Sequence, residues 1–322
     1  MTMITRRRVG VALKIMISVV LVWALMGSVG AQGALDRMLD VSPLWLSVAL
    51  ALGAVQMLIG MVRWRAVLVA LDAPMSWGQT FRFMYIGAFF NQTLPSSVGG
   101  DAVRGYLAYR AGMGLGPAVN GVLLDRIATV LALVLLVVVV MPFAVVTGEG
   151  AQWFAQGVWI VLVLALVGTE TLMLLDRLPS NWQRFRLIAG LSVLAADARR
   201  AFLHPIRMPV LMFWSVLGHV NLSMIVFSLA VGLGVEISPS QCLLLFPPVL
   251  LAQTVPISIA GWGVREGAMI AMFAMAGVSA ESTLAVSILF GVVMVVVSMP
   301  GGLFWMSSDI KTIKDAQAFA ER

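Results

Sequence analysis

The amino-acid sequence predicts an all-α polytopic membrane protein, built as an inverted repeat in which each half holds three spans and one re-entrant helical hairpin. Three observations support this prediction. Hydrophobic residues make up 61% of the chain and charged residues 11%, whereas soluble domains are about half apolar and about a quarter charged. Several apolar runs reach the roughly 20 residues with which a helix crosses a bilayer. One motif occurs twice in the chain.

The repeated motif reads QTLPSSVGGDAVR at residues 92–104 and QTVPISIAGWGVR at residues 253–265. The two copies align without a gap at a constant offset of 161 residues (253 − 92), and 7 of their 13 positions are identical. Chance similarity within apolar sequence is the alternative explanation. The offset of half the chain length favours an internal duplication instead.

Six apolar stretches are predicted to be full spans. In chain order they cover about residues 11–30, 43–62, 119–146, 153–175, 208–234 and 282–306. The first also resembles a signal peptide, but the repeat requires it as an uncleaved helix. Two further regions, 78–112 and 240–277, are apolar but are interrupted by Pro95–Gly100 and Pro256–Gly263. We interpret both as re-entrant hairpins, which brings the count of hydrophobic segments to eight. Reading each hairpin as two short spans would not change the side of the membrane on which the following segments lie, because two crossings return the chain to the same side.

The lysines and arginines fit this arrangement under the rule that cytoplasmic loops carry the positive charge. Arginines cluster at residues 6–8, at Arg63 and Arg65 after the second span, and in the loop 176–207, and lysines occur in the C-terminal tail. Of the arginines and lysines, Arg37 alone falls in a predicted outer loop. We therefore expect both termini in the cytoplasm.

We expect a single membrane domain over residues 1–322, with a first repeat at 1–150 and a second, inverted repeat at 151–310. Because each half makes three crossings, the second half begins on the opposite side, and the two hairpins enter from opposite faces. Inverted repeats with broken helices that meet near the midplane are typical of transporters. In the cytoplasmic loop 176–207, apolar residues at helical spacing over 183–203 predict an amphipathic helix that contacts anionic lipid at the inner surface.

The repeated turns are predicted to present the start of a half-helix to a polar cavity. Prolines end the incoming arms, and glycines let the backbone turn tightly. The free N–H groups and the positive dipole end of the following half-helix suit an anion such as phosphate. No Gly-Lys-Ser/Thr follows the glycines, which excludes a Walker phosphate loop. The candidate residues of the two turns are Gln92, Pro95, Gly99, Gly100, Gln253, Pro256, Gly261 and Gly263.

Arg104 and Arg265 occupy matching places about one turn into these half-helices. Helical side chains lean toward the N-terminus, so both guanidiniums could reach back over the turns and bind phosphate oxygens. An arginine at membrane depth also requires a partner. The alternative is a structural pairing of Arg104 with Asp101 and of Arg265 with Glu266. Because the arginine is repeated, we favour a shared anion site to which Asp101 and Glu266 also belong.

Asp125 and Arg126 place two further charges within the predicted third span. Adjacent helical side chains point about 100° apart, so these two residues are poor partners for one another. We expect each to face the protein interior and to pair with other groups, such as Arg104 or Asp101. Both are candidate substrate-binding residues, and a purely structural ion pair is the alternative.

The sequence indicates neither a metal site nor a cofactor site. It has one cysteine, Cys242, and two histidines, His204 and His219, which lie too far apart for a local zinc motif. We expect His219 and Asn221, deep in the fifth span, to make interhelical hydrogen bonds. We attribute the formal charge of +6 to basic residues in cytoplasmic loops and not to nucleic-acid binding.

Three segments resemble a known family: FNQTLPSSVGGDAVRGYLAYR at 90–110, LLDR at 123–126 and PISIAGWGVREG at 256–267. They are similar to the flippase-like membrane domain of lysylphosphatidylglycerol synthases, and the similarity spans nearly the whole chain. The resemblance implies translocation of a lipid with a bulky polar headgroup. Its motif positions here are Pro95, Gly99, Gly100, Asp101, Arg104, Asp125, Arg126, Gly261, Gly263, Arg265 and Glu266. Ala260 stands where a glycine is expected, and no segment resembles the soluble aminoacyl-transferase domain, so another protein would synthesise the lipid.

We therefore expect a lipid flippase or transporter, and not an enzyme, in a bacterial cytoplasmic membrane. Its substrate would be a lipid with a phosphate-containing headgroup, such as an aminoacyl-phospholipid or a lipid-linked sugar. The other expected partners are anionic lipid at the inner surface and a separate lipid-synthesising enzyme. Two alternatives remain open. One is a membrane-embedded transferase with Asp101 or Asp125 as a base, and the other is a non-transporting subunit that anchors a partner enzyme through the loop 176–207.

Overall fold

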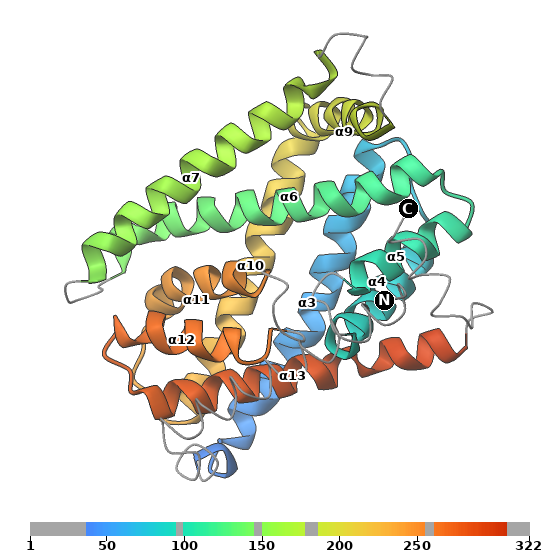
Figure 1. Cartoon of the computed structure of the whole chain (residues 1–322). Helices are drawn as coiled ribbons and strands as arrows, with labels where there is room; N and C mark the ends of the chain where they lie inside the picture. The colour runs from blue at the N-terminus through green and yellow to red at the C-terminus, as the bar shows by residue number, and fades with distance from the viewer. Residues whose placement is uncertain (1–36, 95–98, 145–149, 178–185, 255–260, 308–322) are drawn as a thin grey trace, which may run out of the picture.

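The computed structural model describes residues 37–94, 99–144, 150–177, 186–254 and 261–307. Within these ranges the regular structure is helical (Figure 1), which confirms the all-α prediction for the described part of the chain. The predicted span at 11–30 and the two turn prolines, Pro95 and Pro256, lie outside the described residues.

Five of the described helices are long and apolar enough to cross a membrane. They are α3 (Pro43–Ala70), α6 (Leu115–Val140), α7 (Gly150–Leu174), α10 (Arg207–Gly232) and α13 (Ala280–Met306). Short 3₁₀ turns extend α6 to Phe143 and α7 to Arg177. At a rise of about 1.5 Å per residue, each helix exceeds the roughly 30 Å of the hydrocarbon core. They match five of the six predicted spans, so the chain is a polytopic membrane protein.

Two pairs of shorter helices occupy the regions that the sequence predicts to be interrupted. The first pair is α4 (Trp77–Thr93) and α5 (Gly99–Arg110), and the second pair is α11 (Pro239–Gln253) and α12 (Val264–Ala274). None of the four has the roughly 20 residues of a full span. Moved along the chain by 161 residues, α4 would cover 238–254, which lies within one residue of α11 at each end.

Glycines let the first helix pair and α13 approach with their backbones in contact. A Cβ atom on Gly100 would lie 1.8 Å from the carbonyl oxygen of Gly87, so α4 and α5 can meet as they do because both residues lack side chains. A Cβ atom on Gly301 would lie 2.0 Å from the carbonyl oxygen of Tyr85, which sets α13 equally close to α4. Small residues at such crossings are typical of helix packing in membranes. These contacts fix the position of α5 and of the charges that it carries.

Helix α3 is longer than the sequence predicts. The predicted span ends before Arg63 and Arg65, whereas the helix continues to Ala70. The two arginines do not end the helix, because the protein supplies partners for both. Arg63 donates hydrogen bonds to Asp125, and the guanidinium carbon of Arg65 lies 4.2 Å from the centre of the Trp77 ring. Arg63 therefore belongs to the interior of the bundle and not to a cytoplasmic loop.

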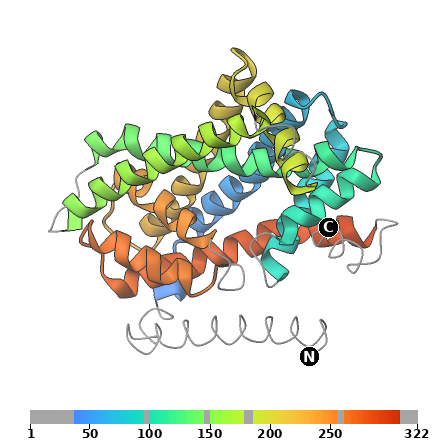
Figure 2. The same ribbon diagram turned by 45° about the horizontal axis from the view of Figure 1, so that its top comes forward.

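Helix α7 lies at the edge of the molecule, alongside α6 (Figures 1 and 2). Its apolar side chains point largely outward, and Trp159, Ile160 and Leu164 are all more than half exposed. A continuous apolar surface of this kind suits hydrocarbon and not water. The main core lies chiefly among α6, α10, α11, α12 and α13, where Phe246 and Phe273 are almost completely buried, and α7 contributes the buried Val158 to it.

Helix α9 (Arg186–Phe202) lies within the segment 183–203 that the sequence predicts to be an amphipathic helix, and protein covers much of its apolar stripe. Leu194, Ala198 and Phe202 are buried in a cluster with side chains of α3, α6 and α10. The buried Asn120 of α6 donates a hydrogen bond of 2.7 Å to Asp197 of α9. These residues are thus not available to lipid, and contact with anionic lipid stays a prediction for the exposed residues of α9.

Candidate functional site

The first half of the repeat carries a chain of alternating charges that begins on α5. Asp101 lies in the first turn of this helix, and Arg104 follows one turn later, so the two side chains share a face. Nε of Arg104 donates a hydrogen bond of 3.0 Å to Oδ1 of Asp101. Both residues are at most 3% exposed. This pairing is the one that the sequence offered as the structural alternative.

The charge chain continues onto α6 and α3 through Asp125. Nη2 of Arg104 donates a hydrogen bond of 2.8 Å to Oδ2 of Asp125. Arg63 of α3 holds the same carboxylate in a two-point contact, with Nε 2.7 Å from Oδ1 and Nη2 3.2 Å from Oδ2. At the other end, Nε of Arg126 donates a hydrogen bond of 2.5 Å to Oδ2 of Asp101. Asp125 and Arg126 thus pair with Arg104 and Asp101, as predicted, but of the two only Asp125 faces the interior, because the Arg126 side chain is 45% exposed.

We call Arg63, Asp101, Arg104, Asp125 and Arg126 the first cluster. It contains three guanidiniums and two carboxylates, so its formal charge is +1. Two uncharged side chains complete its surroundings: the Trp64 ring, whose centre lies 5.0 Å from the Arg104 guanidinium carbon, and the Met84 sulfur, 3.9 Å from Nη1 of Arg104. Four members have side chains no more than 11% exposed, whereas the Arg126 side chain is 45% exposed.

The second half carries a smaller cluster at the start of α12. Glu266 accepts hydrogen bonds from Arg265, with Nε 3.0 Å and Nη2 2.5 Å from Oε1, and from the amide of Gly263 at 2.5 Å to Oε2. Ser287 of α13 contacts both partners, at 3.1 Å from Arg265 Nε and 3.3 Å from Glu266 Oε1. We call Arg265, Glu266 and Ser287 the second cluster. One guanidinium faces one carboxylate, so its formal charge is zero.

The second cluster is packed closely on its neighbours. The Arg265 guanidinium carbon lies 4.6 Å from the centre of the Trp262 ring and 5.7 Å from that of Phe290, which are cation–π distances. A Cβ atom on Gly291 would lie 2.5 Å from Nη2 of Arg265, so α13 presents a glycine where the guanidinium lies. The site of Arg265 thus leaves no room for a side chain at position 291.

The turn residues that the structure describes fill structural roles. Gly261 and Gly263 have φ angles of +80° and +85°, a conformation that glycine adopts without steric cost. A Cβ atom on Gly261 would lie 2.6 Å from Nε2 of Gln253, so the glutamine side chain packs directly on this turn. Gln92 is partly buried in the last turn of α4. A Cβ atom on Gly99 would lie 2.8 Å from the Leu94 side chain.

Each repeated arginine therefore binds a carboxylate of its own half. Among the described residues, no ion pair joins the two clusters. The two halves also differ in charge: the first cluster holds one positive charge in excess, and the second is balanced. Sequence reasoning missed Arg63, whose position at the predicted end of a span indicated a topology marker.

Two polar side chains of α10 connect helices, as predicted. Nε2 of His219 lies 2.9 Å from the carbonyl oxygen of Thr129 in α6. Nδ2 of Asn221 donates hydrogen bonds of 2.9 Å to the Leu52 carbonyl and to Gln56 of α3. Within the described ranges, no group of three or more His, Cys, Asp or Glu side chains is arranged to hold a metal ion.

These features define a class: a helical membrane protein whose interrupted helices carry buried charge clusters. Residues 11–302 match the family described as the lysylphosphatidylglycerol synthase TM region. The match covers most of the 322 residues, and the chain belongs to this family, which confirms the resemblance seen in the sequence. The chain is also similar to a UPF0104 membrane protein of Methanothermobacter thermautotrophicus, with 24% identity over 308 residues; the match covers 84% of this chain and 86% of the relative.

Proposed function

We propose that this protein is a lipid flippase that moves a lipid with a bulky, phosphate-containing headgroup across the bacterial cytoplasmic membrane. Aminoacyl-phospholipids and lipid-linked sugars are the substrate classes that fit. The observation that carries the proposal is the formal charge of +1 on the first cluster, inside an apolar bundle. An unbalanced charge is costly in a low-dielectric interior. A phosphodiester carries one negative charge and would balance it.

The first cluster also supplies suitable donors. A guanidinium offers five N–H donors in a planar fork that matches phosphate oxygens. In this cluster, Arg126 places one N–H on Asp101 and keeps 45% of its side chain exposed. A phosphate could therefore bind Arg126 without separating any of the ion pairs that hold the cluster together.

The proposed architecture is an inverted repeat, with residues 1–150 and 151–310 as its halves and both termini in the cytoplasm. The α4–α5 and α11–α12 pairs would be re-entrant hairpins that enter from opposite sides. The offset of 161 residues, shared by the motif and by the bounds of α4 and α11, supports this proposal. The difference in charge between the clusters favours a binding site in the first half.

A membrane-embedded transferase is the competing function, with Asp101 or Asp125 as a base. Each of these carboxylates accepts hydrogen bonds from two guanidiniums. In both carboxylates, each oxygen atom already accepts a hydrogen bond from a guanidinium, so a substrate proton would have to displace or share one of these contacts. The geometry therefore favours charge recognition over base catalysis.

Reconstitution of the full chain in liposomes tests the proposal. A phospholipid with a fluorescent headgroup would be placed in both leaflets, and an impermeant quencher would report how fast the inner pool reaches the outside. The variant Arg104→Gln lowers the formal charge of the cluster from +1 to zero and should abolish lipid movement while the protein stays folded. Arg104→Lys keeps the charge but loses the planar fork, so it should retain part of the activity.

The matched control is Arg82→Gln. Arg82 lies on α4 and contacts the carbonyl oxygen of Phe304 and the hydroxyl of Ser307, each at 3.2 Å, outside the first cluster. Lipid movement should survive this substitution. Undiminished movement in a folded Arg104→Gln protein would contradict the proposal, and a lipid-modified product without movement would favour the transferase. Neither movement nor product in the wild-type protein would favour an anchor subunit.

A further inference from the structure

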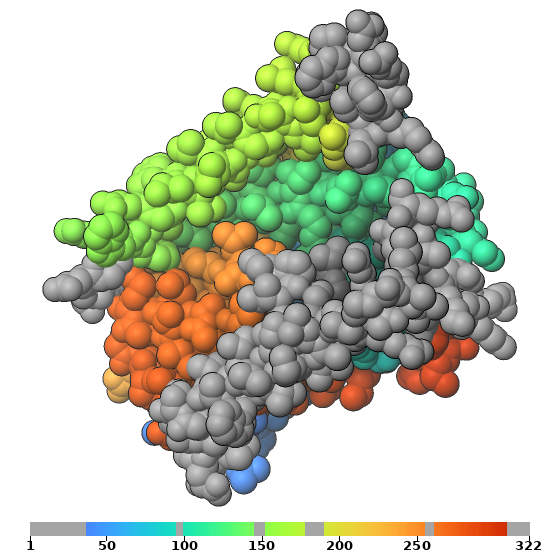
Figure 3. Space-filling view, in the orientation of Figure 1, coloured from blue at the N-terminus to red at the C-terminus, as the bar shows by residue number. Residues whose placement is uncertain are grey.

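A groove between α6 and α7 reaches the first cluster. Its volume is about 290 Å3, and it is open to the surface of the protein. In Figure 3, α6 lies recessed behind the edge formed by α7. The groove is lined by Arg126, Ile127, Val130 and Leu131 of α6 and by Leu164, Ala165, Gly168, Thr169 and Leu172 of α7. This lining is apolar apart from Arg126 and Thr169, and the Thr169 hydroxyl donates to the carbonyl of Ala165.

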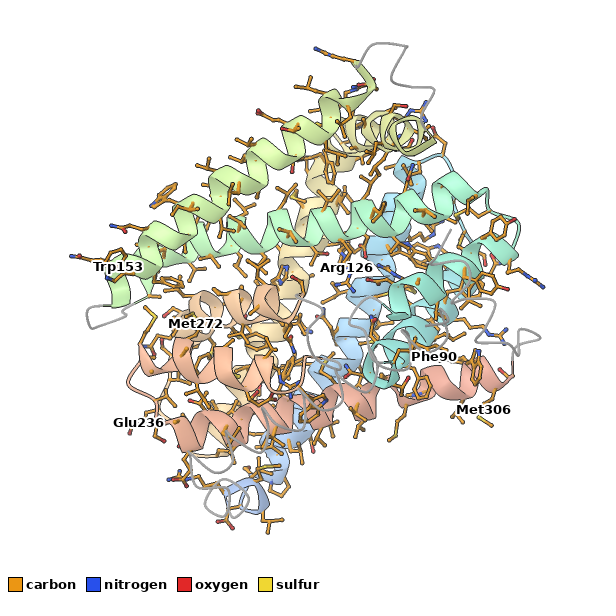
Figure 4. The ribbon with its side chains drawn as sticks, in the orientation of Figure 1. Phe90, Arg126, Trp153, Glu236, Met272 and Met306 are labelled. Atoms are coloured by element: carbon orange, nitrogen blue, oxygen red, sulfur yellow. The ribbon has the colours of Figure 1, made fainter. Side chains whose placement is uncertain are left out.

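Arg126 joins this groove to the first cluster. Its Nε atom holds Asp101, while its terminal amino groups donate to no atom of the described residues. Figure 4 labels Arg126 on α6, near the middle of the molecule. Arg126 is 11 residues beyond Leu115, the first residue of α6, which places it roughly 16 Å along a helix of 1.5 Å rise per residue. Arg126 thus presents a cation at membrane depth beside an apolar groove.

The wall that α7 contributes lies at the exposed surface of a helix that is apolar and long enough to cross a membrane. Leu164 and Gly168 are exposed in this helix, which buries little of its surface in the protein. A chain that lies in the groove would therefore not have to leave the apolar phase. Apolar contact alone gives no preference for one chain over bulk lipid, because lipid tails are as apolar as leucine. The cation at the end of the groove supplies the preference.

We infer that the α6–α7 groove holds one hydrocarbon chain of the lipid whose phosphate binds Arg126. The inference rests on the proposed function and adds a route to it: the headgroup reaches the first cluster in the interior while the chain stays at the edge of the protein. Charge complementarity selects the occupant, because an anionic phosphate with an attached chain satisfies both the cation and the apolar walls.

Photo-crosslinking of the full-length protein in phosphatidylcholine liposomes tests the inference. The probe is phosphatidylglycerol with a diazirine on one acyl chain, and adducts on α6 and α7 are measured by mass spectrometry. Gly168→Leu places a side chain in the groove at a position where a Cβ atom meets nothing within 4 Å. It should lower labelling of the groove about fivefold, which corresponds to roughly 1 kcal/mol of lost preference. The control is Gly116→Leu, on α6, at a position that is equally unobstructed at Cβ and lies outside this groove.

A diacylglycerol with the same diazirine chain should label the groove about fivefold less than the phosphatidylglycerol probe, because it lacks the phosphate. Equal labelling by the two probes, or equal labelling of Gly168→Leu and Gly116→Leu, would overturn the inference in favour of bulk lipid. Competition by excess inorganic phosphate would also overturn it, by indicating a site for the free anion. Normal lipid movement in Gly168→Leu would remove the groove from the route and leave the proposed function standing. Selective labelling without lipid movement would support the site and contradict the flippase.

Discussion

The two repeated arginines should differ in how much the protein depends on them for stability. After Arg104→Gln, each carboxylate of the first cluster keeps one guanidinium: Asp101 keeps Arg126 at 2.5 Å, and Asp125 keeps Arg63 at 2.7 Å. After Arg265→Gln, Glu266 is 1% exposed and keeps only neutral donors. These donors are an amide at 2.5 Å and a hydroxyl at 3.3 Å.

The size of the difference follows from these remaining contacts. Removing one partner of a buried ion pair costs about 3–5 kcal/mol when the other charge is left without a counter-ion. Losing charge-assisted hydrogen bonds while a counter-ion remains costs about 1–3 kcal/mol. We therefore expect Arg265→Gln to lower the free energy of unfolding about 2 kcal/mol more than Arg104→Gln does. Adding Glu266→Gln removes the stranded charge and should restore about 2 kcal/mol of the loss.

Thiol labelling of Cys242 provides the assay. This residue is the only cysteine in the chain and is buried, so a maleimide dye reacts with it when the surrounding helices separate. Labelling would be followed during denaturation in detergent for the wild type, both single variants and the double variant. Equal losses for the two single variants would refute the reasoning, as would a double variant no more stable than Arg265→Gln.

Three further predictions follow from the contacts. Gly291→Ala should destabilise the protein by about 1–3 kcal/mol, as overpacking does, because the new Cβ atom would lie 2.5 Å from Nη2 of Arg265. Gly267→Ala is the control, since its Cβ atom meets nothing within 4 Å; comparable Cys-labelling midpoints for both would contradict this. In vesicle flotation at low salt, Arg200→Gln should weaken association with anionic lipid more than Arg199→Gln. Arg199 is hydrogen-bonded to Asp176 and its side chain is 30% exposed, whereas Arg200 makes a looser ion pair of 3.6 Å with Asp197 and is 60% exposed. Tags at the two termini should be accessible from the same, cytoplasmic side, and accessibility from opposite sides would exclude the inverted-repeat topology.

The sequence predicts the spans well where apolar length alone decides them. α6 and α7 contain long apolar runs, despite Asp125, Arg126 and Glu170, and the structure places both helices within a few residues of the prediction. The end of α3 was missed because charged residues usually mark the membrane boundary, whereas Arg63 continues a buried helix with a partner on α6. For α9, the apolar periodicity predicts that one face is buried, but it does not distinguish burial in lipid from burial in protein. In the structure that face packs on three other helices.

The candidate site was predictable in its local pairs and not in its long-range ones. Asp101 and Arg104 are one turn apart, so their contact follows from helix geometry. Arg63 meets Asp125 across 62 residues of sequence, and no local pattern encodes that contact. Because Arg63 lies just beyond the predicted span 43–62, the sequence analysis read it as a topology marker and not as a partner of Asp125.

The second cluster has a consequence for how the cell makes this protein. α12, with 11 residues, is too short to be inserted as a span of about 20 residues. The hydroxyl that contacts both Arg265 and Glu266 comes from α13, the last helix that the structure describes. A growing chain emerges N-terminus first, so Arg265 and Glu266 leave the ribosome before the helix that completes their surroundings. The second cluster is therefore complete only once α13 is in place, and a nascent chain halted before residue 287 would present an incompletely satisfied ion pair to the membrane quality-control machinery.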